Sequence, residues 1–360
     1  MDHNKIVEAL RTVQDPKTGL DIVEAKLVSE LRVTEKQVSF AFNNLELEGE
    51  MKSTMNFACI SAIQAIYPEA DVHVHMHSEH EDKKSLVLPQ VTNIIAVASG
   101  KGGVGKSTMS VNLAYGLKEA GYEVGILDAD LYGPSIPTML GLQGLRPKIE
   151  TLYGKHKVVP LCHEGVYAIS LGFIIEPEQA VVLRGPRLGG IIKQFINDCL
   201  WPKLDYLIID LPPGTGDIQL TMVQTVPVTG SIIVTTPQEV AVVDAVKAMN
   251  MFLLPNVNVP ILGVIENMSW FTPEELPDNK YLLFGEGGGK RVAEIAESQL
   301  LGQVPLIQGI REGGDTGKPA ILDNDHLAKP YFKNVVAQLI AQVDKRNKEM
   351  KPTETVKIIS

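Results

Sequence analysis

The sequence predicts a three-layer α/β fold with a mostly parallel sheet, preceded by a small α/β domain. From Asn93 onward, short apolar runs alternate with segments of helical periodicity, which is typical of parallel sheets covered by helices on both faces. Several of the runs are continuously apolar, as expected of strands buried on both sides. A glycine-rich turn joins the first run to the first helical segment. The predicted strands of the sheet are 94–98, 123–127, 166–170, 205–209, 231–235, 261–265 and 303–305.

The glycine-rich turn has the spacing of a phosphate-binding loop. Residues 100–107 read Gly-Lys-Gly-Gly-Val-Gly-Lys-Ser, which matches G-x-x-x-x-G-K-[ST]. An apolar strand precedes the motif, and a periodic segment that ends at Gly121 follows it, so the motif has the setting that it needs. We therefore predict a P-loop NTPase fold. The residues expected to hold the nucleotide are Gly100, Lys101, Gly102, Gly103, Val104, Gly105, Lys106, Ser107 and Thr108.

The residue types in this loop explain its chemistry. Glycines allow successive backbone N–H groups to turn inward around an anion, and the helix that follows adds its positive end. Lys106 is expected to reach the β- and γ-phosphates, and the hydroxyl of Ser107 is expected to bind Mg²⁺. ATP and Mg²⁺ are therefore the expected cofactors.

Two other predicted strands end in carboxylates. Asp128 and Asp130 follow the strand at 123–127, and Asp210 follows the strand at 205–209. Ligands of parallel sheets bind beyond the carboxyl ends of the strands. We expect Asp210 to serve Mg²⁺ as a Walker B carboxylate, Asp128 to lie near the same ion and Asp130 to orient the attacking water. The alternative for Asp128 and Asp130 is that they cap the next turn.

Two later positions complete the predicted site. Pro212-Pro213 stiffens the exit of the strand before Gly214, whose backbone N–H could bind a γ-phosphate and release it after hydrolysis. Asn267 follows the strand at 261–265 and offers a donor and an acceptor that suit the edge of adenine. The alternative for Asn267 is a structural role in its loop. Arg311 could pack near the base or form a surface ion pair.

The first 77 residues predict a separate small α/β domain. A periodic segment near the start, two alternating segments, an Ala- and Met-rich helix and a further alternating segment follow one another there. The last segment places His73, His75 and His77 on one face of a strand. We interpret this face as solvated. The alternative is a metal site, because imidazole binds several transition metals. We expect a linker at 78–92, the NTPase domain at 93–345 and a loose tail at 346–360.

Composition excludes several classes of protein. The net charge of −10 argues against general binding to nucleic acid or to anionic membranes. The three cysteines, Cys59, Cys162 and Cys199, are far apart and form no C-x-x-C pair, as is usual in a reducing compartment. No apolar run is long enough to span a bilayer, and the N-terminus lacks a signal sequence. We expect a cytoplasmic protein, with no nucleic acid and no membrane among its partners.

Lys101 gives the loop a second lysine. Its position predicts a side chain that points away from the phosphates held by Lys106, and the plain interpretation is a solvated lysine. The pattern Lys-Gly-Gly-x-Gly-Lys-Ser-Thr resembles the deviant Walker A loop of the MinD, ParA and nitrogenase iron protein class. In that class this lysine reaches the ATP of a second subunit, so the resemblance implies a homodimer that encloses nucleotide.

Further motifs resemble the Mrp/ApbC family, which is known for iron–sulfur cluster carrier ATPases. The first 77 residues are similar, more weakly, to the small iron–sulfur assembly domain that often precedes such ATPases. The resemblance implies an iron–sulfur cluster as cargo and iron–sulfur acceptor or scaffold proteins as partners. The matching stretches are 99–108, Leu127-Asp128-Ala129-Asp130-Leu131-Tyr132-Gly133-Pro134-Ser135, Leu183-Arg184-Gly185-Pro186, 210–216, Glu266-Asn267-Met268-Ser269 and 310–317.

One feature departs from this family. The family usually carries a C-x-x-C pair shortly after the Asn-Met-Ser stretch, where two subunits would share a cluster through thiolates. Thr272 and Glu275 stand near those positions here, and neither is a soft ligand for iron. The N-terminal domain offers no obvious replacement, because Cys59 is expected to be a small core residue within a helix.

These observations together predict an ATP-hydrolysing homodimer that carries or helps to assemble iron–sulfur clusters. Lys101, Lys106, Asp130 and Asp210 are the expected catalytic residues, and Ser107, Asp128 and Asp210 the expected surroundings of Mg²⁺. The ligands of a cluster stay unknown. The alternative is a positioning ATPase similar to ParA or MinD, which would dock on DNA or a membrane and carry no cluster.

Overall fold

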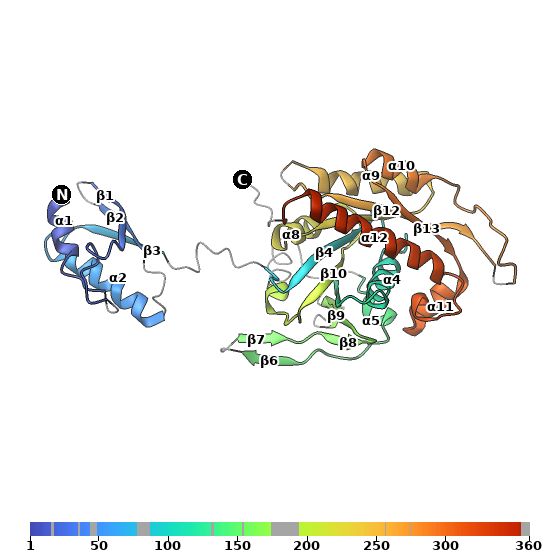
Figure 1. The fold of residues 1–360 in the computed structure, drawn as a ribbon, viewed down its shortest axis with the longest axis horizontal. Helices are drawn as coiled ribbons and strands as arrows, with labels where there is room; N and C mark the ends of the chain where they lie inside the picture. The colour runs from blue at the N-terminus through green and yellow to red at the C-terminus, as the bar shows by residue number, and fades with distance from the viewer. Residues whose placement is uncertain are drawn as a thin grey trace. The chain divides into compact units, whose positions relative to one another are not determined.

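A computed structural model describes the chain in two compact units, Met1–Leu86 and Val87–Ser360 (Figure 1). Among the described residues, none of the helices has the length and apolar character needed to cross a bilayer. The residues described are all of 1–360 except 16–17, 35–36, 44–48, 78–86, 131–132, 153–154, 174–193, 256, 274 and 354–360. The family-like stretch Leu183-Arg184-Gly185-Pro186, together with Leu131 and Tyr132, lies outside the described residues.

The N-terminal unit is a three-stranded sheet packed against two helices. Strand β2 (Gln37–Asn43) lies between β1 (Val28–Val33), which is antiparallel to it, and β3 (Asp71–His77), which is parallel to it. Helix α2 (Gly49–Gln64) makes the crossover from β2 to β3, and α1 (His3–Leu10) packs beside α2. Its core consists of apolar side chains that are almost fully buried, among them Ile6, Leu10, Phe40, Cys59 and Ile63. The expectation that Cys59 is a core residue within a helix is confirmed.

The histidine face of β3 is described in part. The His73 side chain is exposed, and its Nε2 lies 3.0 Å from Oδ2 of Asp71. The side chains of His75 and His77 lie outside the described residues. Within the part of the chain that the structure describes, no group of three or more His, Cys, Asp or Glu residues could hold a metal ion.

The second unit contains the predicted parallel sheet, which the structure extends to eight strands in the order β13-β12-β11-β4-β10-β5-β9-β8. Each predicted strand is present, and the pairs from β13 to β9 are parallel. The bounds are β4 Val91–Ala98, β5 Val124–Asp128, β9 Val166–Ser170, β10 Leu204–Asp210, β11 Gly230–Thr235, β12 Ile261–Phe271 and β13 Leu300–Leu306.

Helices cover both faces of this sheet, so the prediction of a three-layer α/β fold is confirmed. Alternate residues of β4 enter two separate cores, with Ile95 and Val97 on one side and Ile94 and Ala96 on the other. Such alternation follows from the opposite directions of successive side chains in a strand. Helices α4 (Lys106–Glu119) and α12 (Lys329–Glu349) cover the first side, and α8 (Asp217–Thr225), α9 (Glu239–Leu253) and α10 (Gly288–Ile295) cover the second.

The remaining elements lie at one edge of the sheet and near the end of the phosphate loop. Strand β8 (Leu161–His163) pairs antiparallel with β9, and β6 (Ile149–Leu152) forms a separate hairpin with β7 (Lys155–Val158). The short helix α5 (Ile136–Met139) contacts α11 (Gln308–Thr316). Two 3-10 turns, η1 (Leu171–Phe173) and η2 (Ala320–Leu322), complete the unit.

The structure corrects two of the predicted boundaries. The linker expected at 78–92 is too long, because Leu88 is 7% exposed within the core and β4 begins at Val91. The tail expected at 346–360 begins too early, because α12 continues to Glu349 and buries Arg346. The last helical turn is rich in charged residues, so its periodicity is hidden in the sequence. The burial of Phe332, Val335, Leu339 and Val343 shows that this last helix packs into the core.

Candidate nucleotide site

The phosphate loop leaves the carboxyl end of β4 and enters α4 at Lys106. Gly105 precedes the helix with a φ of 82°, and a Cβ there would lie 2.2 Å from Nδ2 of Asn267. A Cβ on Gly100 would lie 2.0 Å from the backbone carbon of Asp244. Side chains at these positions would clash with their neighbours, and L-residues rarely adopt a positive φ. The two glycines are therefore required by the path of the loop.

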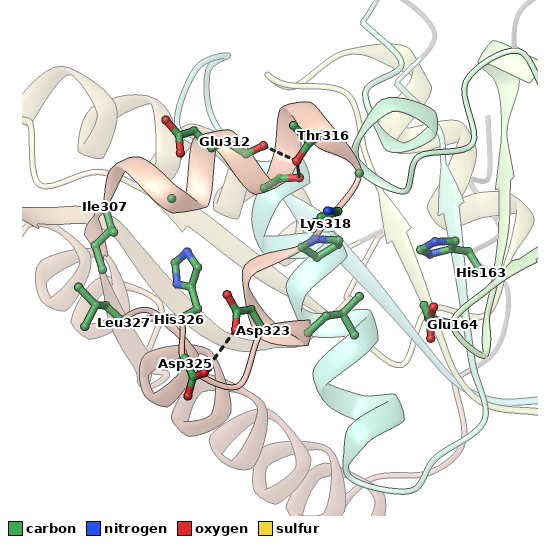
Figure 2. A pocket seen from close by; sticks show the side chains of 15 residues that line it. His163, Glu164, Ile307, Glu312, Thr316, Lys318, Asp323, Asp325, His326 and Leu327 are labelled. Atoms are coloured by element: carbon green, nitrogen blue, oxygen red, sulfur yellow. Dashed lines mark hydrogen bonds between the residues drawn. The ribbon is translucent and has the colours of Figure 1, made fainter. Parts of the chain in front are cut away.

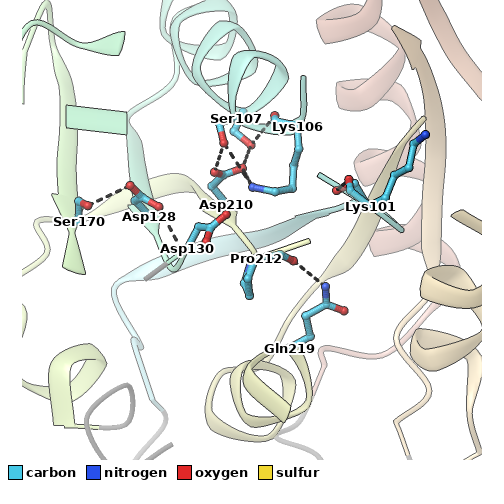
Figure 3. A network of polar contacts seen from close by, with 11 residues as sticks. Lys101, Lys106, Ser107, Asp128, Asp130, Ser170, Asp210, Pro212 and Gln219 are labelled. Atoms are coloured by element: carbon cyan, nitrogen blue, oxygen red, sulfur yellow. Dashed lines mark hydrogen bonds and ion pairs between the residues drawn. The ribbon is translucent and has the colours of Figure 1, made fainter. Parts of the chain in front are cut away.

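Three side chains of α4 converge on Asp210 at the end of β10 (Figure 3). Nζ of Lys106 lies 2.8 Å from Oδ1 of Asp210, and both residues are buried. The hydroxyl of Ser107 donates to Oδ2 over 2.6 Å, and the hydroxyl of Ser110 donates to Oδ1 over 2.6 Å. A buried carboxylate is stable only when it is paired and hydrogen-bonded, and here it has both kinds of partner. The structure therefore brings the predicted Lys106, Ser107 and Asp210 together.

Asp128 occupies the adjacent strand, where it pairs in register with Asp210. Its Oδ2 accepts a hydrogen bond from the hydroxyl of Ser170 over 2.9 Å, and its Oδ1 accepts one from the N–H of Asp130 over 3.1 Å. Burial and then the nearby charge of Asp210 raise the pKa of Asp128 to about 8, because both disfavour a second negative charge. Asp128 is fully buried behind the site, so its nearest polar contacts are with the protein.

A small cavity marks the place where the loop can enclose phosphate. Its volume is about 200 Å³, and Asp130 is among its lining residues. Ser135, which ends the family-like stretch that begins at Leu127, also lines this cavity, as does Met139, which the sequence did not single out. The remaining lining residues are Ser99, Lys101, Gly102, Gly103, Val104, Gly105, Lys106, Ser107, Thr108 and Pro213. Most of the predicted nucleotide-binding residues thus surround one hollow. The predicted site residues that do not line it are Gly100, Asp128, Asp210, Gly214 and Asn267.

The segment after β10 is fixed by two hydrogen bonds. The N–H of Gly214, which we expected to be free for a γ-phosphate, donates to the carbonyl of Ser99 over 2.9 Å. The amide of Gln219 donates to the carbonyl of Pro212 over 2.7 Å. Binding of phosphate by Gly214 would therefore require its bond to Ser99 to be exchanged.

Asn267 lies behind the phosphate loop. Its Nδ2 donates to the carbonyl of Val104 over 2.9 Å, and its side chain is 5% exposed. In this position the amide supports the backbone of the loop, which is the alternative that the sequence left open. Arg311 is exposed and forms ion pairs with Glu312 and Asp315 on α11.

Lys101 differs from Lys106 in its direction. Figure 3 shows its side chain leading away from the cluster around Asp210. The residue is half-buried, and its Nζ has no ion pair with another described residue. This geometry agrees with a lysine that does not serve the phosphates held by its own loop.

Thiol ligands are absent from the place where the family resemblance implies them. Thr272 is buried just after β12, and its N–H donates to the carbonyl of Leu306 over 3.2 Å. Burial raises the pKa of the Cys59 thiol to about 12 and also raises the pKa of Cys199, so neither provides a thiolate readily. Among the three cysteines, Cys162 is the exposed one.

Sequence reasoning missed two residues that shape this site. Ser110 lies one helical turn after Ser107, on the face of α4 that meets Asp210. The i, i+3 spacing of the two serines was a signal for this contact. Ser170 is the partner of Asp128 and comes from β9, and no local pattern in the sequence predicts that pairing.

The three-layer sheet and the arrangement of Lys106, Ser107 and Asp210 around the loop define a P-loop nucleotide-binding protein. A family model described as NUBPL iron-transfer P-loop NTPase matches residues 90–340, and one described as iron–sulfur cluster assembly protein matches residues 3–76. The chain belongs to the NUBPL iron-transfer P-loop NTPase family, and the resemblance derived from its motifs is confirmed.

One curated relative matches over nearly the whole chain, and another matches over about two thirds of it. A protein of Synechocystis sp. named iron–sulfur cluster carrier protein is 42% identical over 340 residues, which covers 93% of this chain and 96% of the relative. A protein of Escherichia coli K12 with the same name is 49% identical over 232 residues, covering 64% of this chain and 61% of the relative.

Solved structures agree on the fold. A nucleotide-binding protein from Archaeoglobus fulgidus in complex with ADP is 34% identical, with a TM-score of 0.57 over 66% of this chain and 92% of the other. The cell division ATPase MinD from Pyrococcus furiosus has a TM-score of 0.51 at 21% identity, over 69% of this chain and 98% of the other. The second likeness shows the fold alone.

Proposed function

We propose that this protein is an ATP-hydrolysing iron–sulfur cluster carrier or assembly factor that works as a nucleotide-dependent homodimer. The observation that carries the proposal is the 42% identity to an iron–sulfur cluster carrier protein over nearly the whole of both chains. The match therefore includes the N-terminal unit as well as the NTPase unit. The contacts around Asp210 supply the NTPase part of the proposal.

The residues around Asp210 suit ATP and Mg²⁺. Mg²⁺ prefers oxygen ligands, and the Ser107 hydroxyl and the Asp210 carboxylate lie within 2.6 Å of each other at the phosphate loop. We assign Mg²⁺ to these two oxygens, with the β- and γ-phosphates held by Lys106 and the loop amides. Asp128 supports this arrangement from the neighbouring strand.

Hydrolysis needs a group that positions water and a group that stabilises the charge of the transferred phosphoryl. Asp130 lines the cavity together with the phosphate loop and is assigned to the water. Lys101 points away from its own Asp210 cluster and is assigned to the nucleotide of a second subunit. Asn267 and Gly214 are assigned to the nucleotide only after they exchange their present bonds with Val104 and Ser99.

The cluster enters this account as cargo. The described side chains provide one exposed cysteine, and Thr272 and Glu275 stand where the family usually has its cysteines. We propose that cargo is held together with ligands from a donor, an acceptor or a second copy of the chain. This part of the proposal is separate from the NTPase part and is tested separately.

Anaerobic purification tests the carrier function. Protein purified without oxygen, or reconstituted with iron and sulfide, is expected to contain iron and acid-labile sulfide and to activate an apo-ferredoxin. The C162A variant reports whether the exposed cysteine takes part. Absence of bound sulfide, together with no gain in holo-ferredoxin above a protein-free control, would refute the carrier function and leave the NTPase assignment standing.

The alternative of a positioning ATPase gains no support from the curated relatives, which are named as cluster carriers. The apolar stripe of α12 is buried in the core of the unit and is not available as a membrane-surface helix. ATP-dependent sedimentation with anionic liposomes or DNA would be needed to revive this alternative.

A further inference from the structure

A second and larger cavity lies beside α11, and no described residue lines both this cavity and the one at the phosphate loop. Its volume is about 1100 Å³. Three segments line it: the turn between β8 and β9, one face of α11, and the segment that leads from α11 to α12 (Figure 2). Ligand pockets span about 300 to 1,000 Å³, so this hollow has room for a short stretch of polypeptide.

Carboxylates dominate the charged lining of this cavity. Glu164, Glu312, Asp323 and Asp325 line it against a single basic side chain, Lys318. Glu312 is partly neutralised by Arg311, whose Nη2 lies 2.9 Å from it. The other three carboxylates are exposed and have no ion pair within the described part of the chain. The excess of negative charge favours a cationic ligand.

A histidine adds a hydrogen-bond donor to this acidic lining. Nδ1 of His326 accepts the N–H of Ala328 over 3.0 Å, so the neutral ring carries its proton on Nε2. That Nε2 is buried and has no partner among the described residues. Nδ1 of His163 lies 2.6 Å from the hydroxyl of Tyr115, and this contact anchors the ring to α4. Imidazole N–H groups bind carbonyl oxygens, which a polypeptide has and a simple polyamine lacks.

The wall of this cavity is joined to the phosphate loop by two routes. Met139 lines the nucleotide cavity and also packs beneath α11, where a Cβ on Gly314 would lie 3.9 Å from it. Asn112 bridges α4 to the segment after α11, because it donates to the carbonyl of Thr108 over 2.8 Å and accepts the N–H of Ile321 over 3.0 Å. Thr108 lines the nucleotide cavity, so both routes end at the nucleotide.

We propose that this cavity is a docking site for a basic segment of a partner polypeptide, and that docking there is linked to the nucleotide. The carboxylates select Lys or Arg side chains, and the Nε2–H group of His326 selects a backbone carbonyl. The packing of α5 against α11 and the Asn112 bridge connect the two cavities. If nucleotide binding moves α4 or α5, the shape of the docking site therefore changes with it. Linkage is reciprocal, so the docked segment also changes nucleotide affinity. The proposal does not depend on cluster carriage.

A labelled peptide of alternating arginine and glycine provides the probe, with fluorescence anisotropy as the readout. The test variant carries E164Q, D323N and D325N, which remove the three unpaired carboxylates. The matched control carries D278N, E294Q and E297Q, which remove the same charge from exposed positions of the same unit. We expect at least about tenfold weaker binding in the test variant and unchanged binding in the control.

Three outcomes would overturn the proposal. Equal weakening in both variants would mean that bulk charge alone attracts the peptide, and no saturable binding below about 1 mM would mean that no site exists. Full competition by spermine at equal charge would mean that backbone recognition is absent. ATP hydrolysis is expected to stay at the wild-type rate in both variants, so failure of the docking proposal is distinguishable from failure of the NTPase assignment.

The linkage has a test of its own. The peptide is expected to bind with different affinity in the presence of ADP and of a non-hydrolysable ATP analogue, and equal affinities would overturn the linkage.

Discussion

At the scale of single residues, the two lysines of the phosphate loop have different surroundings. Lys106 is buried against Asp210, whereas Lys101 is half-buried and points away from that carboxylate. The motif predicted this difference, because residue identity and spacing determine which lysine follows the last glycine of the loop. Ser110 also donates to Asp210. Its i, i+3 spacing from Ser107 places it on the same face of α4, but the sequence does not show that this face meets a carboxylate 100 positions away.

Substituting each lysine should separate nucleotide binding from hydrolysis. Lys106→Ala removes the cation that we assign to the phosphates, and we expect nucleotide affinity measured by calorimetry to fall by about 100-fold or more. Lys101→Ala should leave affinity within about twofold and reduce hydrolysis by about 100-fold, as expected for a charge that acts on the transition state. Equal effects of the two substitutions on binding would contradict the separate roles.

Asp128 should make the stability of the NTPase unit depend on pH. Its pKa is raised to about 8 in the folded protein, above the ordinary value of an unfolded chain, so the folded state retains a proton that the unfolded state releases. Stability from this group is therefore complete below the unfolded pKa of about 4 and is lost as the pH rises through the folded pKa, with a slope near 1.4 kcal/mol per pH unit. Urea unfolding of Asp128→Asn between pH 5 and 7.5 should show a flatter pH dependence than the wild type. An unchanged slope would mean that Asp128 is ionised in the fold.

At the scale of elements, the apolar strands were predictable, and the polar elements were not. Strands β6 and β7 are short, and the described side chains of β6 are exposed, so no apolar run marks them. The stretch after β13 reads as a loop because it contains three glycines among polar residues, yet it forms α11. Contacts with α5 and with the turn at η2 stabilise this helix, and such contacts are long-range.

Substitution of Glu266 would show how much long-range contacts contribute to holding α10 against the sheet. Its carboxylate is fully buried and accepts hydrogen bonds from the N–H of Gly289 and the amide of Gln303, both over 2.6 Å. It thereby joins the start of α10 to β12 and β13. Glu266→Ala leaves two buried donors unpaired, so the free energy of unfolding should fall by about 2 to 4 kcal/mol in urea titration. Glu294→Ala, an exposed change on α10, is the control and should alter it by less than about 0.5 kcal/mol.

At the scale of the whole molecule, the sequence predicted two units of different architecture, and the structure describes two compact units. The resemblance of both parts to iron–sulfur proteins was readable from motifs and is confirmed by the family matches. The large cavity beside α11 could not be predicted, because its lining comes from three segments that are joined only by the fold. The proposed function depends most on the proposal that two copies of the chain share their nucleotides across a dimer.

Mixing the two lysine variants tests this central claim most directly. If each nucleotide is held by Lys106 of its own subunit and Lys101 of the other, a dimer of one Lys101→Ala and one Lys106→Ala subunit contains one intact site. Statistical mixing of equal amounts makes half of the dimers mixed, so we expect the ATPase rate to recover to about one quarter of the wild-type value. A mixture whose rate never exceeds the mean of the two variants alone would contradict a lysine acting across the dimer.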